Sequence, residues 1–200
     1  MSATTIQSLT AALGRSQGPT SDFDLNPDTV LAADRRLRPA GVLVPLVMRG
    51  GEARVILTMR SSRLKHHPGQ IAFPGGKQDE GDADVTAAAL REAHEEIGLS
   101  PANVEVLGLL SSHETVTGFN VTPVVGRVLA PFTPVPEAGE VAEVFEVPLE
   151  HLLTQSRYRI EGRRWRGTRR LYYTVPYGPY YIWGATARML RVLADVAGHP

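Results

Sequence analysis

Residues 73–99 read FPGGKQDEGDADVTAAALREAHEEIGL, and this stretch determines how the rest of the chain is interpreted. A Pro-Gly-Gly turn and an acidic loop precede a segment with helical periodicity. Three successive alanines, at 87–89, favour a helix, and Gly98 is expected just beyond its end, where glycine is common. Four positions recur at the spacing of one helix face and predict its apolar stripe: Thr86, Leu90, Ala93 and Ile97.

Three carboxylates share one turn near the end of this helix, at Glu92, Glu95 and Glu96. Like charges at this spacing repel one another, and the last turn of a helix disfavours anions. Arg91 is the one nearby cation in the helix. A divalent ion such as Mg²⁺, which takes oxygen ligands, would relieve the repulsion. The alternative is a solvated acidic helix end, but the preceding Gly-Gly turn and acidic loop favour a metal site.

The stretch resembles the signature of the Nudix hydrolases, G-x5-E-x7-R-E-U-x-E-E-x-G-U, where U is aliphatic. Its second half is matched by Arg91, Glu92, Ala93, Glu95, Glu96, Gly98 and Leu99. The first half departs, because Asp82 stands in place of Glu and eight residues separate it from Arg91. The resemblance implies an α/β protein, a Nudix-type α/β/α sandwich with a mixed β-sheet, that hydrolyses a diphosphate bond.

Composition agrees with one ordinary globular domain. The chain has 200 residues, 42% apolar and 21% charged, with 21 basic and 21 acidic side chains. This balance gives no reason to expect a nucleic-acid or membrane partner. The absence of cysteine excludes disulfides, thiolate ligands and a cysteine nucleophile. With no apolar run of roughly 18 residues and no secretory signal pattern, a cytoplasmic protein is expected.

Strands and helices are expected on both sides of the acidic helix. The predicted strands are 41–48 and 54–59, joined by a turn at 49–52, then 70–73, 104–110 and 121–129, and a late hairpin of 158–160 with 170–175. Pro123 suggests that its strand is an edge strand or carries a bulge. Further helices are predicted at 150–153 and 185–196. We divide the chain into an N-terminal arm, 1–39, with a short helix around Ile6, Leu9 and Leu13, and a Nudix hydrolase domain, 40–197.

A basic loop lies between the second strand and the acidic stretch. Within eight residues it carries Arg60, Arg63, Lys65, His66 and His67. Cations beside a metal site suit a polyphosphate, although a solvated loop would also explain them. The two histidines are expected at the surface or behind the site rather than as ligands, because the helix already supplies hard oxygen donors.

The loop and the glycine turn together resemble the motif that precedes the Nudix box in coenzyme A pyrophosphatases, L-T-x-R-S-x3-K-x3-G-x-I-x-F-P-G-G. The matching residues are Leu57, Thr58, Arg60, Ser61, Lys65, Gly69, Ile71, Phe73, Pro74, Gly75 and Gly76. Stretches 116–124 and 183–187 resemble the same subgroup. The resemblance implies a small-molecule substrate, coenzyme A or a derivative, cleaved to 4′-phosphopantetheine and adenosine 3′,5′-bisphosphate.

Roles for the site residues follow from this resemblance. Mg²⁺ or Mn²⁺ would be held by Glu92, Glu95 and Glu96, and Arg91 would orient these carboxylates through Asp82 or simply pair with Glu95. The general base is expected outside the box, at Glu140, with Glu143 in reserve. The substrate-binding residues would be Arg60, Ser61, Arg63, Lys65, Gly75 and Gly76.

Other functions remain open. The same box could serve another nucleoside diphosphate derivative, such as ADP-ribose, NADH, a dNTP or capped RNA, or a non-catalytic nucleotide sensor. The arginine-rich segment 157–170 could bind a nucleotide or an acidic neighbour, although a solvated face explains it more simply. A homodimer is compatible with the arm and with the tyrosine-rich segment 172–181.

Overall fold

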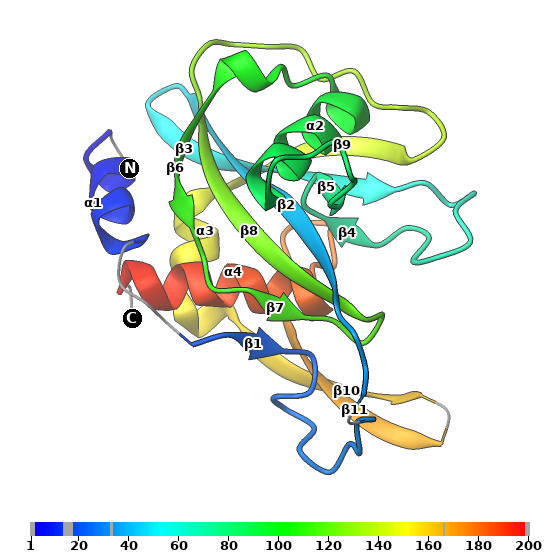
Figure 1. Ribbon diagram of the computed structural model, residues 1–200. Coiled ribbons are helices and arrows are strands. Elements are labelled where there is room, and N and C mark those ends of the chain that lie inside the picture. The colour runs from blue at the N-terminus through cyan, green and yellow to red at the C-terminus, as the bar shows by residue number, and fades with distance from the viewer. Residues whose placement is uncertain (1–2, 14–17, 33, 166, 199–200) are drawn as a thin grey trace.

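The computed structural model describes residues 3–13, 18–32, 34–165 and 167–198 (Figure 1). The helices are α1 (Ala3–Leu13), α2 (Val85–Ile97), α3 (Leu149–Leu153) and α4 (Gly184–Ala197), with 3₁₀ turns at Pro101–Asn103 and Gln155–Arg157. The strands are β1 (Thr20–Ser21), β2 (Arg38–Arg49), β3 (Glu52–Arg60), β4 (Ile71–Ala72), β5 (Gly75–Lys77), β6 (Val104–Leu109), β7 (His113–Glu114), β8 (Phe119–Val128), β9 (Val141–Pro148), β10 (Arg159–Trp165) and β11 (Thr168–Thr174).

The described strands form a nine-stranded mixed sheet and a separate β10–β11 hairpin. The path of the sheet is β1-β7-β8-β2-β3-β4, with β5 beside β2, β6 beside β8 and β9 beside β3. β2 runs parallel to β8, and β1 runs parallel to β7. The predicted turn between β2 and β3 is confirmed: Gly50 and Gly51 have φ of 57° and 86°, as a tight two-residue hairpin requires.

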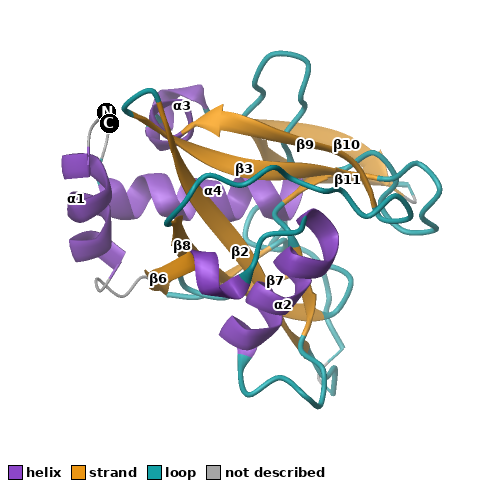
Figure 2. Ribbon diagram, turned by 90° about the horizontal axis from the view of Figure 1, so that it is seen from above, coloured by secondary structure: helices purple, strands orange, loops and turns teal. Residues whose placement is uncertain are grey.

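Helices cover both faces of the sheet, so the α/β/α sandwich with a mixed sheet is confirmed (Figure 2). Alternate residues of the strands supply two separate cores. Leu43, Val124 and Ile56 pack under α2, whereas Val44, Val125 and Leu57 belong to the core shared with α1, α3 and α4.

The apolar stripe predicted for α2 is displaced around the helix. Its buried side chains are Ala88, Ala89, Ala93, Glu96 and Ile97, whereas Thr86 and Leu90 are only partly buried. The alanines form the packing face because the helix lies very close to β2. A Cβ added to Gly41 would lie 1.9 Å from the carbonyl oxygen of Val85. Ala93 and Ile97 belong to this face, as predicted, but Ala88 and Ala89 were treated only as helix formers and their part in it was missed.

Both ends of α2 are capped. The side chain of Asp84 accepts a hydrogen bond from the backbone N–H of Ala87 at 2.8 Å, as an N-cap does. Gly98 has φ of 71° and donates to the carbonyl oxygen of His94 at 2.9 Å. The predicted helix end at Gly98 is confirmed, and a left-handed residue here explains the preference for glycine.

Of the two alternatives for Pro123, the edge strand is wrong, and the register shift beside β8 lies in β6, between Val106 and Gly108. β8 lies inside the sheet, with β2 on one side and β6 and β7 on the other. The carbonyl oxygen of Pro123 accepts a hydrogen bond from the backbone N–H of Leu110, in the gap between β6 and β7. Because the N–H and C=O of a strand residue point to the same side, the missing donor of Pro123 also faces this gap.

The late hairpin is longer than predicted. Its strands pair from Arg159 with Thr174 to Trp165 with Thr168, so both extend beyond the predicted ranges 158–160 and 170–175 toward the turn. The predicted short helix at 150–153 is present as α3, and the helix at 185–196 is present as α4.

The N-terminal segment packs on the rest of the molecule. α1 contacts α4 and β6, and β1 joins the sheet beside β7. The fully buried His113 ring lies between the Thr20 hydroxyl, at 2.9 Å, and the Asp22 carboxylate, at 3.1 Å. The boundary between residues 39 and 40 falls inside β2, and the division into arm and domain stays a prediction.

No helix among the described residues has both the length and the apolar character needed to cross a membrane. The cytoplasmic location and the homodimer stay predictions.

Candidate active site

The glycine turn and α2 meet where the acidic residues cluster. The Glu96 carboxylate accepts a hydrogen bond from the backbone N–H of Gly75 at 3.2 Å. A Cβ on Gly76 would lie 2.6 Å from the Glu92 carboxyl group, and one on Gly75 would lie 2.5 Å from the backbone of β2. Side chains at either position would therefore displace the carboxylate or the strand, which is a physical reason for both glycines.

Arg91 holds the acidic loop against the helix. Its guanidinium donates to both carboxylate oxygens of Asp82, at 3.0 and 2.9 Å, and also to Glu92 at 2.9 Å and Glu95 at 3.1 Å. The hydrogen bonds from Arg91 lower the pKa of Asp82. The two alternatives for Arg91, a loop salt bridge and a pair with Glu95, are thus both present.

Glu96 differs from its neighbours because it is buried. The residue is only 5% exposed, and among the described residues it has no ion pair. Burial raises the pKa of Glu96 to about 7, with a further increase from the charge of Glu92 and an opposing effect of the Gly75 N–H. Burial also raises the pKa of Glu92. Two adjacent carboxylates that ionise reluctantly would both gain from a bound cation.

A loop attached to the end of α2 brings Glu140 to this cluster. The backbone N–H groups of Val135 and Glu137 donate to the carbonyl oxygens of Ile97 and Glu96, at 3.0 and 2.9 Å. These bonds satisfy acceptors that a helix end leaves free. The negative charge of Glu140 raises the pKa of both Glu92 and Glu96, so its carboxylate lies near theirs.

Glu137 shapes the turn that presents Glu140. Its carboxylate accepts hydrogen bonds from the backbone N–H groups of Gly139 and Glu140, each at 2.8 Å. An acid two residues before a glycine is too common a pattern to have revealed this role.

The other downstream acids have partners elsewhere. Glu143 accepts from the Tyr180 hydroxyl at 2.6 Å, Glu146 pairs with Arg49 at 2.8 Å, and Glu114 pairs with Arg35. In the described part of the chain the Glu140 side chain makes no hydrogen bond or ion pair. The geometry therefore favours Glu140 over its reserve, Glu143.

Part of the basic loop reaches the acidic cluster. Arg60, at the end of β3, is close enough for its charge to lower the pKa of Glu96. The buried Ser61 donates its backbone N–H to the carbonyl oxygen of Glu140 at 2.8 Å, and its hydroxyl accepts from the backbone N–H of Arg63. Arg63 and Lys65 are exposed further along the loop and make no ion pair with another described residue.

The carboxylates are not assembled into a finished metal site. Among the described residues, no three His, Asp or Glu side chains are grouped as a ready ligand set. The reason is visible in the contacts, since Glu92 and Glu95 are held by Arg91 and Glu96 by Gly75. The donors nevertheless fit a hard cation, because they are carboxylate oxygens with excess negative charge in a half-buried place.

This architecture defines an α/β/α protein with a cluster of carboxylates on α2, here called the acidic centre. The cluster lies beside the glycine turn and the start of the basic loop. The family of the protein is shown by comparison with known proteins. The NUDIX domain model matches residues 37–170. The chain therefore belongs to the Nudix family, whose hydrolases act on diphosphate bonds.

Relatives of similar length support this assignment. An uncharacterized Nudix hydrolase NudL from Enterobacter sp. is 43% identical, over 86% of this chain and 94% of the relative. Another, from Cronobacter sakazakii, is 46% identical, over 87% of this chain and 90% of the relative.

Solved structures were compared with this chain, and one of them shows the same fold. A MutT/nudix family protein from Enterococcus faecalis is similar with a TM-score of 0.51 and 15% identity, over 84% of this chain and 64% of that one. A Nudix hydrolase from M. smegmatis, RenU, has a TM-score of 0.48 and 28% identity, over 57% of this chain and 72% of that one.

Proposed function

We propose that this protein hydrolyses the pyrophosphate bond of coenzyme A or an acyl-coenzyme A, with Mg²⁺ or Mn²⁺. The products are 4′-phosphopantetheine and adenosine 3′,5′-bisphosphate. One observation carries the proposal: the upstream motif and the Nudix box meet at one place. Ser61 of the motif bonds the backbone of Glu140, and the charge of Arg60 acts on Glu96 of the box.

Glu92, Glu95 and Glu96 are proposed to hold the metal ion. Glu92 and Glu96 lie on one face of α2, next to the glycine turn. The side chain of Glu95 is 57% exposed, so it can reach the ion directly or through water once it leaves Arg91. When bound, the ion neutralises phosphate charge and activates a water molecule. Arg91 keeps the carboxylates in place through its bonds to Asp82.

The remaining residues act on the water and the phosphates. Glu140, whose carboxylate has no partner among the described residues and lies beside the cluster, is proposed to take a proton from the attacking water, as a general base. Arg60 supplies a cation for phosphate oxygens. Arg63 and Lys65, exposed on the same loop, are proposed to contact the adenosine 3′-phosphate.

Product analysis tests this function. The purified protein is incubated with coenzyme A and Mg²⁺ or Mn²⁺, with ADP-ribose in parallel and with EDTA as the metal-free control. We expect metal-dependent release of adenosine 3′,5′-bisphosphate, and we expect Arg60→Ala to reduce it. Comparable turnover of ADP-ribose and coenzyme A would contradict the substrate assignment and favour another nucleoside diphosphate derivative.

A non-catalytic sensor on the same fold is the other alternative. A sensor would not explain why Glu140, which has no partner among the described residues, lies beside Glu92 and Glu96, where the three negative charges repel one another. Absence of any product with either metal, from either substrate, would favour it.

A further inference from the structure

The β10–β11 hairpin carries arginines that face one another. The strand register places Arg163 opposite Arg170 and Arg164 opposite Arg169. Directly opposed residues share a face of the hairpin, and like charges there are destabilising. None of the four makes an ion pair with another described residue. Glu161, the one carboxylate in this hairpin, is bound by Thr174 and Tyr181 instead.

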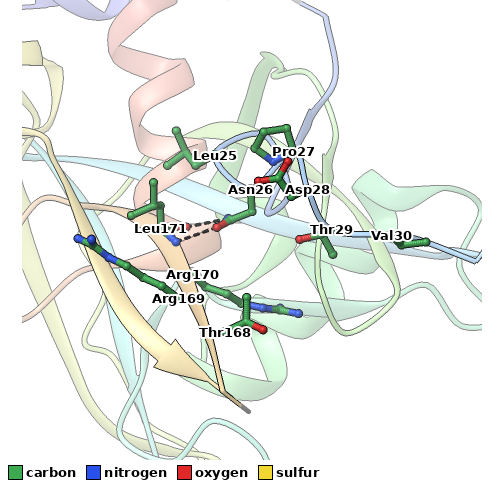
Figure 3. Close-up of a pocket in the computed structure, with 10 residues that line it drawn as sticks. All are labelled: Leu25, Asn26, Pro27, Asp28, Thr29, Val30, Thr168, Arg169, Arg170 and Leu171. Atoms are coloured by element: carbon green, nitrogen blue, oxygen red, sulfur yellow. Dashed lines mark hydrogen bonds between the residues drawn. The ribbon is translucent and has the colours of Figure 1, made fainter.

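A pocket of about 500 Å³ lies between this hairpin and the N-terminal segment. One wall is Leu25–Val30, and the other is Thr168–Leu171 of β11 (Figure 3). The volume falls in the range of small-molecule sites. In Figure 1 the hairpin and α2 lie at opposite ends of the molecule, so this pocket is separate from the candidate active site.

The two walls are joined by Asn26. Its side-chain amide donates to the carbonyl oxygen of Leu171 at 3.0 Å and accepts from the Leu171 N–H at 2.8 Å (Figure 3). The same amide nitrogen bonds the carbonyl oxygen of Asp22 at 3.1 Å. The pocket is therefore formed before any ligand arrives, which lowers the cost of binding.

The free edge of β11 faces the N-terminal segment. Because Asn26 takes both backbone groups of Leu171, these groups point away from β10. The backbone groups of Arg169, two residues earlier, point the same way. In the described part of the chain they bond no other residue, so the Arg169 N–H is a donor available to the pocket.

The lining combines the groups that a nucleoside phosphate needs. Arg170 and Thr168 extend toward the side of Thr29 (Figure 3) and offer donors to a phosphate. Asp28 offers an acceptor to ribose hydroxyls. Apolar contacts for a base are supplied by Leu25, Pro27 and Leu171.

We propose that this pocket is a second ligand site, which binds a nucleoside phosphate through the backbone N–H of Arg169 and the side chain of Arg170 without a metal. A phosphate oxygen offsets the repulsion between Arg170 and Arg163, which share one face of the hairpin, and the sugar and base contact the wall Leu25–Val30. The proposal does not depend on the catalytic activity of the other site.

Titration calorimetry with ADP in EDTA tests this site. EDTA removes divalent ions, so metal-dependent binding and turnover at the acidic centre do not contribute. We expect one ADP per chain in the unaltered protein and in Glu96→Gln. The variant Arg170→Ala should bind at least about tenfold more weakly, since a charged contact is lost. Asn26→Ala should also weaken binding, although it keeps both arginines.

A matched control removes the same charge elsewhere. Arg157→Ala takes away one exposed arginine outside the pocket and should bind ADP normally. An equal loss in this control would show only a general charge effect and would overturn the proposal. Equal affinity for inorganic pyrophosphate would overturn the nucleoside assignment, and absence of ADP binding in EDTA would overturn the site. Coenzyme A hydrolysis, measured separately, decides the proposed function independently.

Discussion

Ser61 donates its backbone N–H to the carbonyl oxygen of Glu140 at 2.8 Å. This bond joins the start of the basic loop, just after β3, to the residue just before β9. It holds the candidate general base beside Glu92 and Glu96, although Glu140 lies 79 residues from Ser61 in the chain. The arrangement leads to four predictions.

Replacing Glu96 by Gln should lower turnover by orders of magnitude with either metal, because an amide is a much poorer ligand for a hard cation than a carboxylate. Steady-state hydrolysis of coenzyme A measures the effect. Glu95→Gln, in the exposed neighbour, should reduce turnover less. Unchanged activity of Glu96→Gln would refute the assignment of Glu96 to the metal.

The same substitution should change the pH dependence of stability in EDTA. The folded protein holds the Glu96 proton up to a pKa of about 7, whereas the unfolded chain releases it near the ordinary value of 4.5. The folded state thus binds more protons between these values, and the free energy of unfolding falls as pH rises through this window, by roughly 3 kcal/mol. Below pH 4.5 both states are protonated and the full stability is present.

Glu96→Gln cannot ionise at this position, so its free energy of unfolding should not fall in this pH window. Its thermal midpoint should exceed that of the unaltered protein at pH 8 and should equal it at pH 4. Thermal unfolding at both pH values, in EDTA, provides the measurement. Glu95→Gln serves as the control, because its side chain is largely exposed. Equal midpoints for Glu96→Gln and the unaltered protein at pH 8 would show that Glu96 is not buried in this way.

Glu137 should act through Glu140. Glu137→Ala removes the acceptor for two backbone N–H groups and should lower kcat with little change in KM, because the turn that positions Glu140 loosens. Glu137→Gln keeps an acceptor oxygen and should restore most of the activity. The pH–rate profile of Glu137→Ala should lose the limb assigned to the base, as in Glu140→Gln. A profile unchanged in shape would leave Glu137 a purely structural role.

Substitutions at Gly76 and Gly41 should have different effects, the first on activity and the second on stability. A Cβ at position 76 meets the flexible Glu92 carboxyl group at 2.6 Å, so Gly76→Ala should displace that ligand and lower turnover while the fold persists. A Cβ at position 41 meets the backbone of α2 at 1.9 Å, so Gly41→Ala should destabilise the fold by about 1–3 kcal/mol or more. Urea unfolding and steady-state kinetics on both variants distinguish these effects, and equal unfolding midpoints would contradict the packing argument.

Local features of the site could be predicted from the sequence. The helix, its end at Gly98 and the three carboxylates on one turn follow from helical periodicity and from the left-handed conformation that glycine adopts easily. The turn at Gly50 and Gly51 follows from the same backbone rule. These features depend on residues only a few positions apart, so neighbouring sequence is enough to specify them.

Only the tertiary structure decided which acids differ from one another. Glu92, Glu95 and Glu96 look alike in sequence, but contact with the glycine turn buries Glu96, while Arg91 holds the other two. Glu140 is distinguished from Glu143 because β9 turns Glu143 toward Tyr180. The interior position of Pro123 and the pocket beside β11 likewise depend on strands that pair across long separations. Burial and charge at each of these places come from segments distant in the chain, and local sequence patterns do not specify how such segments pack.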